Sequence, residues 1–348
     1  MQKMLFTIFL IFIVPVSFFS QELAHGTIKG KVTDLETKEP LTNATVFLEN
    51  TTFGTVTDLK GSYEIVNADP GSYHLIVSMV GYEMKRIPVK VIKGISLALD
   101  AQLKQKPVVL GQINVAGKVT DDWNEYLEIF EREFIGSGKF SREVKILNPE
   151  VINFSKDEKT EEVKALSDSI IILENKALGY KLFIILEAFS YHISGDVDYL
   201  TRVRFQELKA EDDDEKDEWK ENRRYCYLGS PKHFFSSLIK KRLYDEGFGV
   251  RKGSILMLTS GGGSAVSEED FNMEEFGGEF LRLNLDTALK VEYTGRTSAV
   301  TYLTPGAPYF ILLDMAGNRV DANNLKVTGD WAEQRMATAL PYNYLPGE

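Results

Sequence analysis

Regular alternation of apolar and polar side chains over residues 54–83 constrains the fold of this 348-residue chain more than any other feature. Successive side chains of a β-strand point to opposite faces, so residues two apart share a face. The alternating apolar positions are Tyr63 and Ile65 in one run, and Tyr73, Leu75, Val77 and Met79 in the next. The stretch therefore predicts two neighbouring strands, each with one buried face.

Turn-forming residues separate these runs. In the Asp-Pro-Gly sequence at residues 69–71, proline suits the turn position with φ of about −65°, and we expect Gly71 to adopt a positive φ. In the turn at residues 57–61, we expect the Asp58 carboxylate to accept backbone N–H groups and Gly61 to take the left-handed conformation. Both segments predict tight chain reversals.

Further alternating runs flank the first two. They lie at residues 28–32, 44–48, 87–91 and 95–99, and no helical pattern interrupts them. About seven short strands at close spacing are typical of an all-β domain, and two packed sheets bury one face of each strand. We therefore expect an antiparallel β-sandwich over residues 25–104.

The same segment resembles the carboxypeptidase-regulatory-like domain at almost every turn. The matching positions are Gly26, Gly30, Val32 and Asp34, then Pro40, Ala44 and Val46, then Gly54, Asp58, Gly61 and Tyr63, then Pro70, Gly71 and Tyr73, and finally Val80, Gly81 and Tyr82. The resemblance implies a prealbumin-like sandwich, similar in fold to some carbohydrate-binding modules. It also implies an exported protein of Bacteroidetes type, because this domain is common there, including as the N-terminal extension of outer-membrane nutrient receptors.

The family name does not imply carboxypeptidase chemistry for this chain. In true carboxypeptidases the zinc ligands and catalytic residues lie in a separate enzymatic domain, and this sequence has no counterpart of that domain. Residues 167–182 and 224–234 resemble a companion domain that follows this sandwich in other exported proteins of the same bacteria. That second resemblance assigns no functional residue.

After a linker at residues 105–118, we expect an α+β domain of unknown function over residues 119–348, with mostly antiparallel strands. Apolar residues three and four apart predict a helix at residues 121–134. Ser230 as a cap and Pro231 in the first turn predict a second helix, which Gly247 ends. A short helix is expected at residues 330–337. Strands are expected at residues 170–174, 180–186, 200–205, 281–285, 289–293, 300–302 and 309–313.

Two polar segments of this domain are predicted to be irregular. Residues 211–218 carry seven carboxylates and one lysine, and dense like charge favours an exposed loop. The segment lacks the turn glycine and ligand spacing of a calcium-binding loop. Residues 260–264, Ser-Gly-Gly-Gly-Ser, predict a flexible link, and they lack the residues of a phosphate-binding loop or a nucleophile elbow.

The N-terminus has the pattern of a secretory signal. A lysine precedes an apolar run at residues 5–14, and Pro15 interrupts it before Ser20. We expect residues 1–20 to be a signal peptide that is removed after Ser20. No later segment is long and apolar enough to span a bilayer. The mature protein is therefore expected to be exported, either periplasmic or associated with the outer membrane.

Charge and cysteine content exclude two classes of behaviour. The formal net charge of −11 argues against nucleic-acid binding, because such proteins neutralise phosphates with basic side chains. A single cysteine, Cys226, cannot form an intramolecular disulfide, and we interpret it as a buried thiol that packs as a small hydrophobe.

The sequence assigns no catalytic, cofactor-binding or metal-binding residue. The four histidines, His25, His74, His192 and His233, fit no metal-ligand spacing, and we interpret them as structural or surface residues. The favoured hypothesis is an exported, non-enzymatic binding or assembly module of the cell envelope, with an envelope protein or a glycan as partner. The alternative is an envelope hydrolase with its active site in residues 119–348. The ligand and the oligomeric state stay open.

Overall fold

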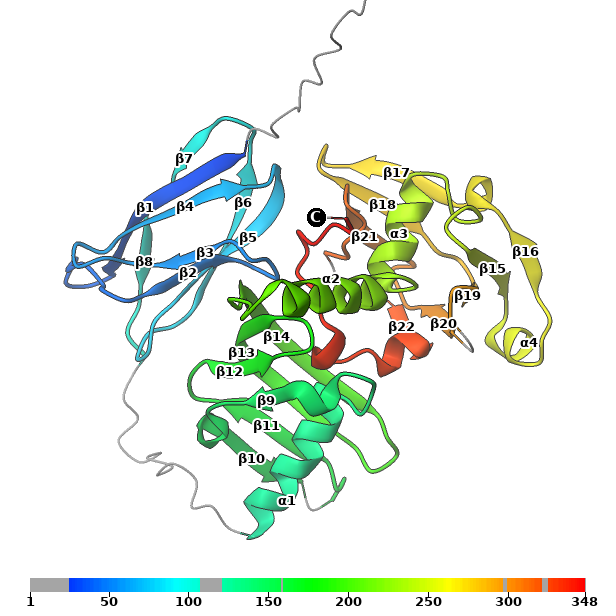
Figure 1. The fold of residues 1–348 in the computed structure, drawn as a ribbon, viewed down its shortest axis with the longest axis horizontal. Helices are drawn as coiled ribbons and strands as arrows, with labels where there is room; N and C mark the ends of the chain where they lie inside the picture. Colours follow the sequence, from blue (N-terminus) through cyan, green and yellow to red (C-terminus); the bar gives the residue numbers. More distant parts are fainter. Residues whose placement is uncertain (1–24, 107–120, 158, 297–298, 321–324, 348) are drawn as a thin grey trace, which may run out of the picture.

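The computed structural model describes residues 25–106, 121–157, 159–296, 299–320 and 325–347. The expected signal peptide and most of the expected linker lie outside these residues. Three hydrophobic cores divide the described chain into a sandwich (residues 25–106), a middle part (residues 121–229) and a C-terminal part (residues 230–331). Figure 1 shows them in blue to cyan, green, and yellow to orange. None of the described helices combines the length and apolar character needed to cross a bilayer.

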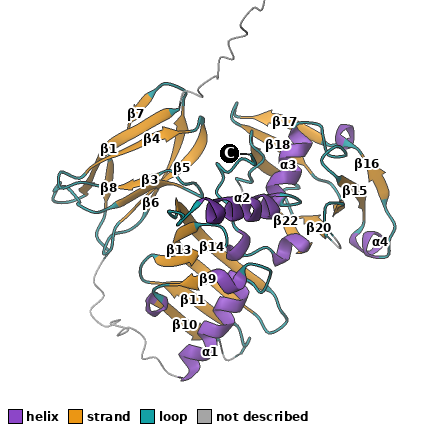
Figure 2. Cartoon of the chain, viewed as in Figure 1, coloured by secondary structure: helices purple, strands orange, loops and turns teal. Residues whose placement is uncertain are grey.

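The sandwich has eight strands in two sheets, and Figure 2 shows no helix in its described residues. The first sheet has the order β4-β1-β7, with β8 also pairing with β1, and the second has the order β3-β2-β5-β6. The bounds are β1 Gly26–Asp34, β2 Thr45–Leu48, β3 Gly54–Val56, β4 Ser62–Ala68, β5 Gly71–Ser78, β6 Lys85–Val91, β7 Ser96–Ala98 and β8 Ala101–Leu103. The expected sandwich is confirmed.

Two pairings, both of β1, depart from the antiparallel expectation. β1 runs parallel to β7 and β8, whereas its pairing with β4 and the pairings within the second sheet are antiparallel. The chain crosses from the second sheet back to the first after β6, so it can enter the first sheet in the same direction as β1. Alternating residues such as Ile28, Val32, Ile65 and Leu75 fill the core between the sheets, as the pattern predicted.

One of the two predicted turns forms as expected. The Asp58 carboxylate accepts the backbone N–H groups of Lys60 and Ser62, both at 2.8 Å, and Gly61 has a φ of 69°. The expectation for Gly71 is wrong, because its φ is not positive and it begins strand β5. On the N-terminal side of the turn, Asn67 takes the left-handed conformation instead, with a φ of 56°. A short polar side chain tolerates that conformation.

The middle part is an antiparallel sheet with helices packed on it. Its path is β10-β11-β13-β12-β9, and β14 pairs with β13. The bounds are β9 Val144–Ile146, β10 Ile152–Lys156, β11 Val163–Ser167, β12 Ile171–Asn175, β13 Tyr180–Tyr191 and β14 Val197–Glu207. Helix α1 (Asp121–Phe130) continues as a π-helix to Ile135, which confirms the first predicted helix. It packs Phe130 and Phe134 against Phe189 of the sheet.

The acidic run at residues 211–218 is helical, so the predicted loop is wrong. Helix α2 (Asp213–Tyr227) begins inside the run, and the Asp212 side chain caps it by accepting from the backbone N–H of Glu215. Carboxylates in a first helical turn interact favourably with the partial positive charge of the helix N-terminus. Trp219 then anchors the helix over Gly179, where a Cβ would lie 2.2 Å from the indole ring.

The C-terminal part contains two antiparallel sheets. One has the order β16-β15-β19-β20-β22 and the other β17-β18-β21. The bounds are α3 Pro231–Ile239, β15 Phe248–Gly253, α4 Ile255–Thr259, β16 Ser264–Val266, β17 Asn272–Phe276, β18 Phe280–Asn284, β19 Ala288–Tyr293, β20 Val300–Pro305, β21 Phe310–Asp314 and β22 Leu325–Gly329. The strands expected in residues 281–313 are confirmed. The region expected as one α+β domain thus contains two separate hydrophobic cores.

Three local expectations need correction. Helix α3 starts at the predicted cap, where the Ser230 side chain accepts from the His233 backbone N–H, but it ends at Ile239 rather than near Gly247. The glycine run at residues 260–264 is a hydrogen-bonded turn that ends α4 and leads into β16. Residues 330–337 form two short 3₁₀ helices, at Asp330–Glu333 and Met336–Thr338, instead of one α-helix.

Candidate functional site

A loop of the sandwich at residues 49–53 joins the sandwich to the middle part. The Asn50 backbone N–H donates to the Val203 carbonyl at 2.7 Å, and the Phe205 N–H donates to the Thr51 carbonyl at 2.9 Å. These bonds add the loop to the free edge of β14. Phe47, on the sandwich face that points away from its core, is only 1% exposed. The other parts of the chain therefore cover this face of the sandwich.

The tail at residues 332–347 holds the same loop from its other side. The Tyr342 backbone N–H donates to the Asn50 carbonyl at 2.6 Å. The Asn343 side chain accepts from the Thr52 N–H at 3.1 Å and donates to the Thr52 hydroxyl at 2.8 Å. The loop is thus fixed by hydrogen bonds from two distant parts of the chain. We call this meeting point the junction.

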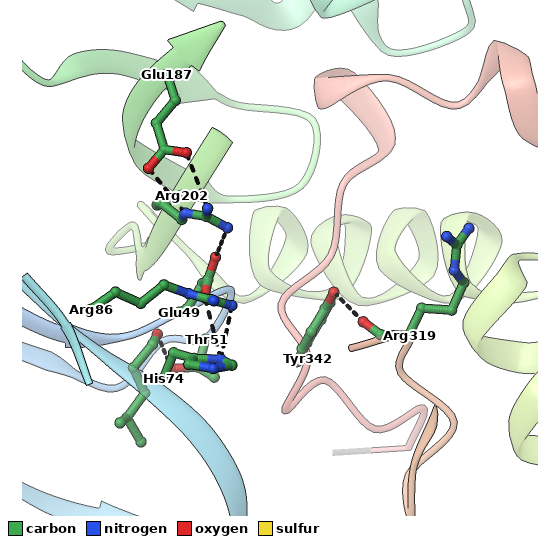
Figure 3. Close-up of polar contacts among 9 residues, drawn as sticks. Glu49, Thr51, His74, Arg86, Glu187, Arg202, Arg319 and Tyr342 are labelled. Carbon is green, nitrogen blue, oxygen red and sulfur yellow. Dashed lines mark hydrogen bonds and ion pairs between the residues drawn. The ribbon is translucent and has the colours of Figure 1, made fainter. Parts of the chain in front are cut away.

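A buried carboxylate organises the charges at the junction (Figure 3). Glu49 is 8% exposed, and its two oxygens accept from Arg86 Nε at 3.0 Å and Arg202 Nη1 at 2.7 Å. Arg202 also reaches Glu187, with Nη2 and Oε2 3.0 Å apart. A buried charge is tolerated when it is paired and hydrogen-bonded, and these contacts meet that condition. The network links the residue that follows β2 with strands β6, β13 and β14.

His74 lies beside this network in a defined protonation state. Its Nδ1 is 3.0 Å from Arg86 Nη2. Guanidinium nitrogens only donate, so Nδ1 accepts and the proton of the neutral ring is on Nε2. Burial and the positive charge of Arg86 lower the pKa of His74 below its ordinary value. The imidazole is therefore neutral at neutral pH.

A cavity of about 620 Å³ lies at the junction and is lined by all three parts and the tail. The sandwich contributes the region of Glu49 and β5, the middle part contributes residues 199–202 of β14, and the C-terminal part contributes the start of α3 and the turn after β21. The tail lines the remaining wall. We call this space the junction cavity. Five cationic side chains and two carboxylates line it.

Lys232, in the first turn of α3, is one of these cationic side chains. Its ammonium donates to the backbone carbonyls of Tyr342 and Tyr344, the latter at 2.8 Å. Burial lowers its pKa to about 8, with opposing contributions from the Asp314 and Asp69 carboxylates. Carbonyls satisfy its hydrogen bonds but bring no full negative charge.

The adjoining wall is built by the turn after β21 and by the tail. Asp314 Oδ1 accepts the backbone N–H groups of Ala316 and Asn318 and so fixes this turn. The Tyr342 hydroxyl donates to the Arg319 carbonyl at 3.1 Å, as Figure 3 shows. Burial raises the pKa of Tyr342 to about 12, so this phenol stays protonated at physiological pH.

The other histidines do not converge on a site. His25 pairs with Asp69 at 3.0 Å, and His192 bonds the Ser194 hydroxyl within its own turn. His233 is buried at the start of α3, where Nδ1 accepts from the Gly229 N–H at 3.0 Å and Nε2 lies 3.3 Å from Glu246. These contacts hold the chain between α2 and α3. The part of the chain that the structure describes contains no cluster of potential metal ligands.

Cys226 is buried, as predicted, and lies at the wall of the junction cavity. Burial raises the pKa of its thiol to about 12. The sulfur is therefore a protonated thiol rather than a nucleophilic thiolate at neutral pH. The Cys226 side chain packs in the hydrophobic core of the middle part.

Sequence reasoning missed the residues that form the junction. Glu49 continues the polar positions of an alternating strand, and Arg202 lies 153 residues further along, so no spacing connects them. Lys232 reads as an ordinary surface residue of a capped helix. The one local signal in the sequence was the polar pair Glu49-Asn50 at the end of a buried strand. In the structure Asn50 takes a positive φ of 60°.

Comparisons with known proteins identify the N-terminal segment. Residues 28–115 match the family model of the CarboxypepD_reg-like domain, which confirms the resemblance. The chain is 33% identical over 98 residues to the TonB-dependent receptor SusC of Bacteroides thetaiotaomicron, covering 28% of this chain and 9% of the receptor. It is 36% identical over 94 residues to the TonB-dependent receptor P39 of Formosa agariphila, covering 26% and 8%. The chain therefore spans less than a tenth of these relatives.

Similarity to solved structures is weaker. A pilus 2b backbone protein of group B streptococcus matches 24% of this chain and 42% of its own, with 18% identity and a TM-score of 0.21. A type II cohesin–X-dockerin complex of Acetivibrio cellulolyticus matches 22% of this chain and 52% of its own, with 23% identity and a TM-score of 0.18. These scores are too low to support a functional argument.

Proposed function

We propose that the chain is an exported, non-enzymatic binding and assembly module of the bacterial cell envelope, with the junction cavity as its ligand site. The observation that carries this proposal is that three separately packed parts and the tail line one cavity. A volume of about 620 Å³ lies in the range of small-molecule sites. Such sites often lie between domains.

Hydrogen bonds and ion pairs between the parts of the chain hold the walls of this cavity in place. Hydrogen bonds from β14 and from the tail fix the loop at residues 49–53. Two arginines clamp Glu49, and Arg202 is held in turn by Glu187. Fixed walls reduce the entropy lost on binding, which favours affinity. The sandwich therefore acts as one wall of a shared site, rather than as a freely moving docking arm.

Placement in the envelope rests on two supports. Residues 1–20 have the charge and hydrophobicity pattern of a secretory signal. The domain at residues 28–115 is shared with two TonB-dependent receptors. We infer a periplasmic or outer-membrane-associated protein in which the sandwich spans residues 25–104 and residues 105–118 link it to the remainder. Residues 119–348 then comprise the two further units.

Binding without turnover is the test of this proposal. Purified residues 21–348 are titrated with soluble envelope glycans and glycan fragments, and the same mixtures are assayed for cleavage products. Saturable binding with no product is expected. Thr201→Trp, which fills the cavity from β14, should abolish that binding. Thr328→Trp places the same side chain on an exposed strand position outside the cavity and should bind normally.

Two outcomes would contradict the proposal. Release of a cleavage product that Thr201→Trp abolishes would support the envelope hydrolase instead. Equal binding by wild type and Thr201→Trp would place the ligand site elsewhere on the chain. Circular dichroism melts of both tryptophan variants show whether each one folds before its binding is compared.

A further inference from the structure

The junction cavity has a charge opposite to that of the chain as a whole. Its lining includes Arg86, Arg202, Lys232, Arg319 and Arg335, but only two carboxylates, Glu49 and Asp314. The whole chain has a formal net charge of −11. Cationic side chains gathered in a concave, partly desolvated site focus a positive potential there, which attracts anions.

Four of the five cations of this lining divide into two groups. Arg86 and Arg202 have carboxylate partners in Glu49, and Arg202 also pairs with Glu187. Lys232 and Arg335 differ, because no ion pair within 4.0 Å involves either one among the described residues. Lys232 bonds only backbone carbonyls, and Arg335 bonds the phenol of Tyr199. Their charges are therefore available to a ligand.

Burying a cation among neutral groups is unfavourable unless something offsets the lost hydration. Lys232 shows this directly, because burial lowers its pKa. A ligand carboxylate or phosphate would supply the missing counter-charge and form short charge-assisted hydrogen bonds with both cations. Perturbed ionisable groups in a cavity are candidates for functional residues for the same reason.

The carboxylates of Asp314 and Asp69 act on Lys232 and offset only part of the effect of its burial, because the pKa of Lys232 stays lowered. Asp314 Oδ1 accepts two backbone N–H groups of its own turn, and Asp314 Oδ2 accepts from the Asn318 side chain at 2.8 Å. Glu49 is likewise occupied by Arg86 and Arg202. Both acids in the lining therefore already have donors.

We propose that the junction cavity selects a small ligand that carries an oxyanion, either a carboxylate or a phosphate, through Lys232 and Arg335. This inference rests on the proposed function and adds the chemical class of the ligand. Tyr199 and Tyr342 lie in the same lining and add aromatic surface for the body of the ligand. Neutral ligands of the same size should bind more weakly.

Matched ligands test the charge requirement. Residues 21–348 are titrated by calorimetry with a galacturonate trimer, its fully methyl-esterified form, glycerol phosphate and inorganic phosphate. At least one anion should bind, and the esterified trimer should bind at least about tenfold more weakly than the acid if the carboxylate is recognised. Preference for the trimer identifies a carboxylated sugar as the source, and preference for glycerol phosphate identifies a phosphate group.

Matched variants test the two cations. Lys232→Met and Arg335→Met should each weaken binding of the preferred anion by about tenfold or more. Lys216→Met and Arg142→Met make the same changes at exposed positions outside the cavity and should bind like wild type. Lys232→Arg keeps the charge and should retain most of the affinity, which separates lost charge from lost folding.

Proton uptake gives a readout that structural damage does not produce. An anion beside Lys232 raises its pKa, so binding at about pH 8 should take up a proton in wild type, but not in Lys232→Met. Calorimetry in two buffers with different ionisation heats measures that uptake. Equal affinity for the acidic and esterified trimers without tighter binding of either phosphate, or no anion binding at all, would overturn the oxyanion inference. Binding of a neutral glycan in the cavity would leave the proposed function standing while this inference falls.

Discussion

At the scale of single residues, the molecule places a few buried charges where distant segments meet and satisfies them almost completely. Asp34 at the end of β1 is the example inside the sandwich. It is 3% exposed and accepts the N–H groups of Glu36 and Thr37, the Tyr82 hydroxyl and the Gln105 side chain. Glu49 is the example at the junction. Each predicts a measurable effect on stability.

Asp34 should make the stability of the sandwich depend on acid pH. Its hydrogen bonds lower its pKa from 3.8 to about 2, so folding favours the ionised form. The stabilisation is complete above the unfolded pKa of 3.8 and is lost as the pH falls through about 2. Asp34→Asn should be less stable at neutral pH and should flatten the stability profile across that window. Urea unfolding at a series of pH values from above 3.8 down to about 2 measures this stability profile. Asp198→Asn, at an exposed position, is the control.

Glu49 should be strongly coupled to Arg202. Removing one partner of a buried ion pair leaves the other charge uncompensated, so Glu49→Ala should lower the free energy of unfolding by about 3 kcal/mol. Arg202→Met should be similar, and the double variant should cost clearly less than the sum of the two. A double-mutant cycle from denaturant unfolding measures this coupling. Strict additivity would show that the pair does not interact energetically.

At the scale of elements, strands and caps could be predicted from the sequence because their signals are local. The alternation of Tyr63 and Ile65, the Asp58 turn and the Ser230 cap depend only on neighbouring residues. The start of α2 was not predicted, because repulsion between dense like charges favours an exposed loop. In the structure the Asp212 carboxylate instead caps the helix. The loop at residues 49–53 could not be predicted, because its partners lie as far away as Asn343, 291 residues along the chain.

That loop should transmit backbone strain to the ligand site. Asn50 has a φ of 60°, and a β-branched side chain in this conformation costs about 1–2 kcal/mol. Asn50→Val should therefore destabilise the chain and also weaken ligand binding, since Asn50 bonds both β14 and the tail. Asn43→Val is the matched control, with a φ of 61° at an exposed position outside the cavity lining. It should lose similar stability and keep full affinity. If both variants bound the ligand with equal affinity, the loop at residues 49–53 would not contribute to the ligand site.

At the scale of the whole molecule, three separately packed cores are held together by polar contacts around the junction. The sandwich reaches the middle part through the loop at residues 49–53. It also reaches the C-terminal part, where Lys90 pairs with Glu279 at 2.7 Å. The tail crosses back to contact the sandwich and the core of the middle part. A ligand in the cavity would therefore stabilise contacts between parts that lie far apart in the sequence.

Hydrogen–deuterium exchange with and without the preferred oxyanion ligand is the most direct test of a site shared by all three parts. Slower exchange is expected together in the loop at residues 49–53, in residues 199–203 of β14, in residues 230–235 and in the tail. Exchange in the distant α4 should be unchanged. Protection confined to the sandwich alone would contradict a shared site, as would protection centred on surfaces outside the junction.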